Sequence, residues 1–393
     1  MIFNKFRLED ITDKIGDGIH GTPEYDDNGD FYFVNGNNLV DGDIVFKNDT
    51  KRINEEQYFK NKRNLNKNTL LVSINGTLGN IAKYNNEKII LGKSACYINV
   101  KDEYNVDYVY FVFESPEFKK YLQYGANGTT IKNVPLSAIR NYEISIPSKD
   151  NQDKIVKILK SIEDKIKLNN RISNNLHDLA EQQFNDIYSK GTPKKLDELL
   201  FNVSTGSRPK GGAQKSGVPS IGAEKIEKFG VYNYSSEKYI SEDYYEKLKN
   251  GRLNSGDVLL YKDGAYTGKV SMCLNGFPHN KAAVNEHVFI LNTENNWAQN
   301  YLYFTLYNKD NKEILHRLAS SKAAQPGLNQ VELKSIEINI CNKEDIINFE
   351  NNIRPIMEKI ALNSLENKKL SELRDTLLPK LMNGEIDLDN IEI

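Results

Sequence analysis

The chain of 393 residues is 39% hydrophobic, 27% charged and 10% aromatic, which suits a globular protein with room for two or three domains. This composition excludes collagen, a chain that is coiled coil throughout, and wholesale disorder. The 52 basic and 54 acidic residues give a formal charge of -2, so any attraction for nucleic acid must come from local basic patches.

No apolar run approaches the ~20 residues that a membrane span needs. The N-terminal stretch MIFNKFRLEDITDK carries acidic residues where a signal peptide has its apolar segment. The three cysteines, Cys96, Cys273 and Cys341, are too widely spaced for a disulfide framework or a metal cluster. We therefore expect a cytoplasmic protein without a metal site.

The chain contains two related halves. Residues 108–147 and 301–341 both have an aromatic-rich helical start, a polar loop and a closing strand, EISIP in one and EINIC in the other. Upstream, LLVSINGTLG (70–79) matches VLLYKDGAYTG (258–268), since each is an apolar strand that ends in a turn with two glycines. The order of these segments is the same in both halves, which indicates a duplicated unit of about 150 residues.

A long helix is predicted after each unit, because apolar residues recur there at three-four spacing. A stripe of this kind does not stay in water, so we expect the two helices to pair as an antiparallel coiled coil. The predicted interface consists of Ile155, Ile162, Ile166, Asn169, Ile172, Leu176, Leu179, Ile353, Ile356, Ile360, Asn363, Leu370, Leu373 and Leu377.

Two asparagines occupy equivalent places in these stripes, Asn169 in the first helix and Asn363 in the second. Buried in the interface, each would cost stability but fix the register of the pair. At the edge of the stripe, each would be solvated instead. Both interpretations are open from the sequence.

The predicted fold class is α+β, with two globular α/β domains, two long antiparallel coiled-coil helices and an internal pseudo-twofold axis. The first globular domain is expected at 1–150 and the second at 191–345. The helical segments are expected at 151–190 and 346–393. Pro193 marks the linker between the first helix and the second globular domain.

Basic residues gather in four windows without Asp or Glu, at 57–86, 118–142, 203–223 and 314–331. Phosphate binding requires such local positive fields. Asn and Gln can pair with adenine, Arg and Lys with guanine, and Thr offers a hydroxyl and a methyl group. The candidate DNA-binding residues are Lys62, Arg63, Asn75, Thr77, Asn127, Thr129, Thr130, Lys132, Asn133, Ser207, Arg208, Lys210, Lys262, Tyr266, Lys269, Ser320, Ser321, Lys322, Gln325, Asn329 and Gln330.

Each of these residues also has an ordinary structural explanation, because polar loops are usually polar for the sake of solvation. Glycines such as Gly76 and Gly264 are more often turn formers than DNA contacts. The inference of DNA binding therefore rests on the windows together.

Motifs of catalysis are missing. No Asn-Pro-Pro-aromatic or Asp-Pro-Pro-aromatic tetrad of a DNA methyltransferase occurs. Gly92-Lys93-Ser94 has the tail of a phosphate-binding loop, but Glu87 stands where the first glycine belongs. The five histidines have no cysteine or carboxylate partner at ligand spacing. We expect a protein without catalytic residues.

At the first junction between domain and helix, the strand ends with Ile146-Pro147 and the helix opens with Gln152. A Gly-Asp-strand-Gly-Gly element covers 256–268. With these motifs, the organisation of nearly the whole chain resembles the specificity subunit of type I restriction–modification enzymes. The chain departs from that pattern at Cys341, which replaces the second proline, and at 68–69, where Asn-Thr replaces Gly-Asp.

The resemblance implies two target-recognition domains, each of which recognises one half of an asymmetric bipartite DNA target. It also implies that the helix pair sets the spacer and docks two modification subunits. Those subunits would carry S-adenosylmethionine, and ATP-dependent restriction subunits would use ATP and Mg²⁺, whereas this chain would hold no cofactor. The alternatives are a diverged nuclease or methyltransferase and a coiled-coil protein-binding scaffold.

Overall fold

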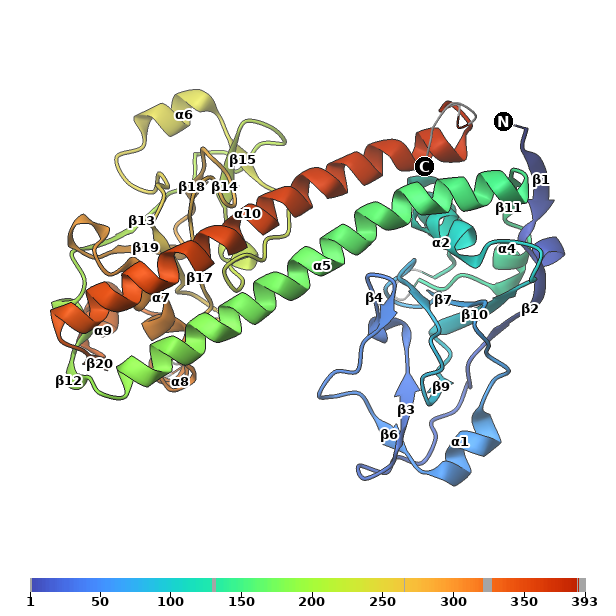
Figure 1. Cartoon of the computed structure of the whole chain (residues 1–393), viewed down its shortest axis with the longest axis horizontal. Helices are drawn as coiled ribbons and strands as arrows, with labels where there is room; N and C mark the ends of the chain where they lie inside the picture. The colour runs from blue at the N-terminus through green and yellow to red at the C-terminus, as the bar shows by residue number, and fades with distance from the viewer. Residues whose placement is uncertain (1, 129–131, 265, 321–326, 387, 389–393) are drawn as a thin grey trace. The chain divides into compact units, whose positions relative to one another are not determined.

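The computed structural model describes residues 2–128, 132–264, 266–320, 327–386 and 388 (Figure 1). Its contacts divide the chain into two compact units, Met1–Glu163 with Glu372–Ile393 and Asp164–Ser371. Each unit therefore combines one globular domain with a part of both long helices. No helix in the described ranges is both long enough and apolar enough to cross a membrane.

The first unit is built from short strands and four helices of ordinary length among the described residues. The strands are β1 (Asn4–Arg7), β2 (Thr12–Asp17), β3 (Phe31–Val34), β4 (Leu39–Val40), β5 (Asp43–Ile44), β6 (Arg52–Ile53), β7 (Thr69–Ser73), β8 (Ile81–Lys83), β9 (Ile89–Leu91), β10 (Ala95–Val100) and β11 (Glu143–Ile146). The helices are α1 (Glu55–Asn61), α2 (Val106–Glu114), α3 (Pro116–Gly125) and α4 (Leu136–Arg140).

The second unit is built in the same way. Its strands are β12 (Thr192–Lys195), β13 (Asn202–Thr205), β14 (Val218–Ile221), β15 (Tyr239–Ile240), β16 (Val258–Tyr261), β17 (Val270–Met272), β18 (Ala283–Val284), β19 (Val288–Asn292) and β20 (Glu337–Ile340). Its helices of ordinary length are α6 (Glu242–Lys247), α7 (Gln299–Tyr307), α8 (Lys309–Ser320) and α9 (Gln330–Ser335).

Strand order confirms the duplication. The main sheet has the order β2-β10-β7-β8 in the first unit and β13-β19-β16-β17 in the second, with every pair antiparallel. The first strand of each domain pairs with its last, β1 with β11 and β12 with β20. A smaller sheet repeats as well, since β3 runs parallel to β9 and β14 runs parallel to β18.

The helical start predicted for each related half is divided into two helices, α2 and α3 in the first unit and α7 and α8 in the second. Ser115 ends α2 and caps α3 by accepting a hydrogen bond from the Phe118 backbone N–H, and Pro116 occupies the first turn of α3. In the second unit, Asn308 separates α7 from α8 and accepts a hydrogen bond from the Asp310 N–H. Each break lets a second helix turn away from the buried, aromatic-rich first one.

The two long helices, α5 (Lys149–Tyr188) and α10 (Lys343–Met382), have 40 residues each. They lie side by side and run in opposite directions (Figure 1). In the first unit, Ile155 of α5 belongs to the same hydrophobic cluster as Leu378 of α10 and the main sheet. In the second unit, Phe184 of α5 shares a cluster with Ile353 of α10 and the local sheet. The apolar stripes therefore pack on the globular domains as well as on each other.

The predicted interface differs from the structure at two positions. Leu179 and Leu373 are 44% and 46% exposed, so their assignment to the interface is wrong. On α5, the inward positions are taken by His177, Ala180 and Phe184, because this end of the helix packs on a globular domain as well as on α10. The remaining predicted residues are buried (Ile155, Ile162, Asn169, Ile353, Ile360 and Asn363) or half-buried (Ile166, Ile172, Leu176, Ile356, Leu370 and Leu377).

A polar layer interrupts the apolar contact between α5 and α10. Asn169 and Asn363 are each 1% exposed, which rules out the solvated interpretation. Asn169 Nδ2 donates hydrogen bonds to Glu366 Oε2 at 2.8 Å and Asn367 Oδ1 at 2.9 Å, and Asn363 Nδ2 donates to Ser173 Oγ at 3.1 Å. Because these bonds exist in only one alignment of the two helices, the layer favours a single register.

We predict that Asn169→Ala lowers the free energy of unfolding by about 1–3 kcal/mol, because it removes two hydrogen bonds donated by a buried side chain. Asn170→Ala is the matched control, since Asn170 is exposed and accepts only one bond, from Asn367. Both variants gain the same helix propensity, so their difference reports the burial of Asn169 and its additional hydrogen bond. Urea denaturation followed by circular dichroism measures the effect, and equal losses in both variants would contradict a buried layer.

Candidate nucleic-acid interface

The main sheet of the second unit brings three loops to one edge. β13 and β16 end at Thr205 and Tyr261, and β19, which lies between them, begins at Val288. Because β19 is antiparallel to both neighbours, Thr205 pairs with Phe289 and Tyr261 pairs with Val288. The loops after β13 and β16 and the turn before β19 therefore meet.

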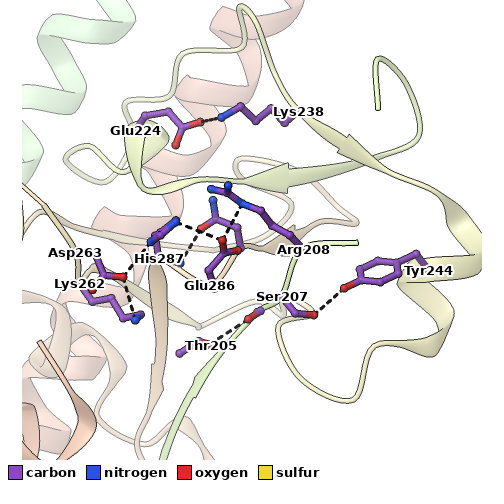
Figure 2. Close-up of polar contacts among 12 residues, drawn as sticks. Thr205, Ser207, Arg208, Glu224, Lys238, Tyr244, Lys262, Asp263, Glu286 and His287 are labelled. Atoms are coloured by element: carbon purple, nitrogen blue, oxygen red, sulfur yellow. Dashed lines mark hydrogen bonds and ion pairs between the residues drawn. The ribbon is translucent and has the colours of Figure 1, made fainter. Parts of the chain in front are cut away.

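A chain of charged side chains links these three loops (Figure 2). Arg208 Nε lies 3.0 Å from Glu286 Oε1, and the same oxygen lies 3.3 Å from His287 Nε2. His287 Nδ1 lies 3.0 Å from Asp263 Oδ2, which also lies 3.0 Å from Lys262 Nζ. The position of Arg208 therefore depends on side chains that come from two other loops.

The ion pair holds Arg208 by Nε, and its side chain is 50% exposed. Its two terminal amino groups have no partner among the described residues. A guanidinium held in this way can offer donors to the O6 and N7 of guanine. Gly206 allows the loop to approach β18 closely, because a Cβ there would lie 1.7 Å from the Val284 carbonyl oxygen.

Glu286 has one satisfied and one unsatisfied oxygen. Oε1 contacts Arg208 and His287, whereas Oε2 is buried and has no hydrogen-bond partner among the described residues. A carboxylate oxygen without a donor is costly when buried. This cost points to a role in positioning Arg208 rather than in stability.

Other candidates from the second unit make contacts within the protein. Lys262 is ion-paired with Asp263, and Ser207 Oγ shares a hydrogen bond of 2.8 Å with the Tyr244 hydroxyl. Lys210 is exposed in the loop that follows β13.

The candidates near α9 include two that stabilise the backbone. Asn329 caps this helix by accepting a hydrogen bond from the Glu332 N–H at 2.9 Å, and Gln330 Nε2 donates to the Val203 carbonyl at 3.2 Å. Ser320 is exposed at the end of α8. Ser321, Lys322 and Gln325 lie outside the described residues.

Tyr266 and Lys269 lie in the turn before β17. Tyr266 is 64% exposed, and Lys269 Nζ lies 4.9 Å from the centroid of its ring. Lys269 also forms an ion pair with Glu227. These two residues line a pocket beside α8 together with residues of that helix.

In the first unit, the structure brings together two loops that are far apart in the sequence. Asn133 forms backbone bridges with both Asn75 and Asn127, and Asn75 Nδ2 donates a hydrogen bond to Asn133 Oδ1 at 3.3 Å. The Lys132 carbonyl accepts a hydrogen bond from the Gly76 N–H at 3.1 Å. The second unit has a bridge at the same place, between Asp263 and Gly327.

Within this pair of loops, Lys132, Asn127 and Thr77 are exposed. Thr129 and Thr130 lie outside the described residues. Lys62 is exposed with Nζ 4.7 Å from the centroid of the Phe59 ring. Arg63 donates hydrogen bonds of 3.1 Å to the carbonyls of Asp17 and Gly18, so its guanidinium supports the backbone after β2.

The sequence analysis missed the acidic residues of this interface. Glu286 and Asp263 hold Arg208, His287 and Lys262, but a search for windows without acids excludes such residues from the start. The available signal was the strand pattern, because Asp263 lies two residues after the segment of β16 and Glu286 lies two residues before that of β19.

Among the residues that the structure describes, one group has ligand atoms close enough to hold a metal. His177, Asp178 and Glu181 on α5 place one such atom each within 4.8 Å of one another, so the expectation that no histidine has a carboxylate at ligand spacing is wrong here. Burial, together with the positive charges of Lys228 and Lys312, lowers the pKa of His177 to about 3. The same two charges oppose a bound cation.

Comparisons with known proteins point to one family. Residues 3–178 match the family described as the type I restriction modification DNA specificity domain. The type I restriction enzyme MjaIX specificity subunit of Methanocaldococcus jannaschii is 24% identical over 350 residues, which cover 83% of this chain and 79% of the relative. The HindI specificity subunit of Haemophilus influenzae is 23% identical over 345 residues, with coverage of 70% and 75%.

A solved structure shows the same fold. The type I restriction–modification S subunit from M. genitalium aligns with a TM-score of 0.58 at 17% sequence identity. The alignment covers 97% of this chain and 96% of that subunit, so it includes both globular domains and both long helices.

Proposed function

We infer that this chain belongs to the DNA specificity subunits of type I restriction–modification systems, and that it recognises DNA without catalysing a reaction itself. The observation that carries this function is the repetition of one sheet order in two domains, each followed by a helix of 40 residues. Two related domains with different loops suit a protein that recognises two different short DNA sequences.

Each domain recognises one half of an asymmetric bipartite target. In the second domain, Arg208 is the principal base-contacting residue, because Glu286 holds it by Nε and leaves its terminal amino groups exposed. In the first domain, the corresponding contacts come from the loops that Asn133 joins, with Lys132 exposed beside them. The halves differ because these side chains differ.

The helix pair sets the number of base pairs between the two halves. The buried layer of Asn169 and Asn363 favours one register of α5 on α10, so the pair has one length. Half-sites on the same face of B-DNA are centred about 10 base pairs apart.

The partners are two modification subunits and ATP-dependent restriction subunits, and the helix pair is the docking surface for the modification subunits. Those subunits hold S-adenosylmethionine and methylate DNA, and the restriction subunits use ATP and Mg²⁺. This chain contributes DNA recognition alone. Exposed apolar residues on the outer faces of the long helices, including Leu168, Leu179, Leu362 and Leu373, suit protein docking.

We predict that Arg208→Ala relaxes base preference in one half of the target and that Lys132→Ala affects the other half. Loss of a bidentate guanine contact costs about 1–3 kcal/mol. Glu286→Gln keeps Arg208 but removes its positioning carboxylate, so it relaxes the same half to a smaller degree. The measurement is methylation of randomised targets by the chain with its modification subunits.

The matched control is Glu198→Gln, which removes an exposed carboxylate 3.8 Å from Lys194. It should leave both half-sites unchanged, because exposed ion pairs contribute little. Equal relaxation of both halves by Arg208→Ala would contradict the assignment of one domain to each half. Methyl transfer by the chain alone would contradict the non-catalytic role.

We predict that deleting residues 164–170 together with 366–372 shortens the spacer by about three base pairs. These segments face each other through the bonds of Asn169, and seven residues of helix span about 10 Å. Two helical turns are removed, so the remaining residues keep their faces. Mapping of the methylated target measures the gap, with Asn175→Ala as a control on exposed α5 surface. An unchanged gap in an active double deletion would refute the spacer role.

A further inference from the structure

One face of α8 borders a cavity of about 790 Å³ in the second unit. A volume of this size suits a small organic ligand. Its other walls come from the turn before β17, the end of α7 and the second half of α5. The lining residues are Glu181, Tyr266, Thr267, Gly268, Lys269, Tyr307, Lys309, Lys312, Glu313, His316 and Arg317.

Lys312 is a half-buried cation that forms no ion pair with a described residue. Its Nζ lies 3.5 Å from the centroid of the Tyr307 ring, and no carboxylate of a described residue lies within ion-pair distance. Burial lowers the pKa of Lys312 to about 8, and the more distant charge of Glu181 only partly opposes this shift. An anion in the pocket would supply the missing charge.

The equivalent lysine of the first unit shows what is different about Lys312. Lys119 on α3 lies 193 residues before Lys312, and Leu122 and Leu315 are related by the same shift. A Cβ at Gly79 would meet Leu122 and Lys119, and one at Gly268 would meet Leu315 and Lys312, so the two helices sit alike against a turn. Lys119, however, is ion-paired with Glu114 Oε2 at 2.6 Å.

Tyr307 stands where Glu114 stands in the repeat. The second unit has therefore exchanged the carboxylate partner of this lysine for an aromatic ring. The exchange leaves a positive charge and a ring face together in one cavity.

The rim carries the same combination of chemical groups. Tyr266 is 64% exposed, and Lys309 and Arg317 are exposed basic residues on the pocket face of α8. Two carboxylates, Glu181 and Glu313, also line the cavity and can accept hydrogen bonds from the amino group of a base. Phosphate, a planar ring and an exocyclic amino group occur together in a nucleotide.

We propose that the α8 pocket binds a nucleotide, with its phosphate at Lys312 and Arg317 and its base against Tyr307 or Tyr266. Two sources have this chemistry, a free nucleotide and an unstacked nucleotide of bound DNA. The DNA source rests on the proposed function, whereas the free source does not. Stacking on an aromatic ring stabilises an unstacked base relative to its exposure to water.

Binding to the purified full chain tests this proposal. Calorimetric titration with AMP, inorganic phosphate and adenosine is expected to give the tightest binding for AMP, which has both groups. Anisotropy with a duplex that carries one bulged adenosine, against the same duplex fully paired, tests the DNA source. Preference for AMP alone indicates a free ligand, and preference for the bulge indicates DNA.

Three variants connect binding to this pocket. Lys312→Gln should weaken the binding of AMP or of the bulged duplex about tenfold or more, since it removes a charge-assisted contact. Tyr307→Leu should weaken the binding of AMP but leave the binding of inorganic phosphate unchanged. Lys119→Gln is the matched control in the first unit and should bind as the unsubstituted chain does.

The proposal is overturned if neither AMP nor the bulged duplex is preferred over its reference, or if Lys312→Gln and Lys119→Gln bind alike. Target methylation with the modification subunits is measured in parallel. If the unsubstituted chain supports sequence-specific methylation but prefers neither AMP nor the bulged duplex, the result counts against this pocket alone. Absence of sequence-specific methylation in the unsubstituted chain counts against the proposed function, and AMP binding then still decides the pocket.

Discussion

The pairing of α5 with α10 is the constraint on which the rest of the structure depends. Each helix carries an apolar stripe that must be buried, and each stripe is covered partly by the other helix and partly by a globular domain. The helices are therefore part of both hydrophobic cores. The layer of Asn169 and Asn363 makes this contact specific for one alignment, because the hydrogen bonds that their side-chain nitrogens donate across the pair form only in that alignment.

The duplicated domain supplies a constant frame for variable loops. In both units, the middle strand of the main sheet is antiparallel to its neighbours, so the same three loops meet at one edge. In the first unit, bridges among asparagines join the loop after β7 to the loop after α3, and in the second unit the charged chain from Arg208 to Lys262 links the loops after β13 and β16 to the turn before β19 (Figure 2). Recognition can therefore change while the sheet remains the same.

The sequence predicts the local features of this molecule better than the long-range ones. Three-four spacing identifies both long helices, since that period depends only on neighbouring residues, and it puts Asn169 in the apolar stripe without deciding whether the residue is buried or solvated. The same period predicts that Leu179 is buried, but Leu179 is exposed because other residues of α5 face the globular domain there. Strand order and the carboxylate of Glu286 beside Arg208 arise from segments about 80 residues apart, and no local pattern reports such a contact.

The central claim is that two different recognition domains act on one DNA molecule at a distance set by the helix pair. Mapping of methylated bases across the genome of a cell that expresses this chain with its modification subunits tests it most directly. The account predicts one motif with two unlike half-sites and a gap of constant length. A continuous motif, two identical halves or a gap that varies from site to site would contradict it.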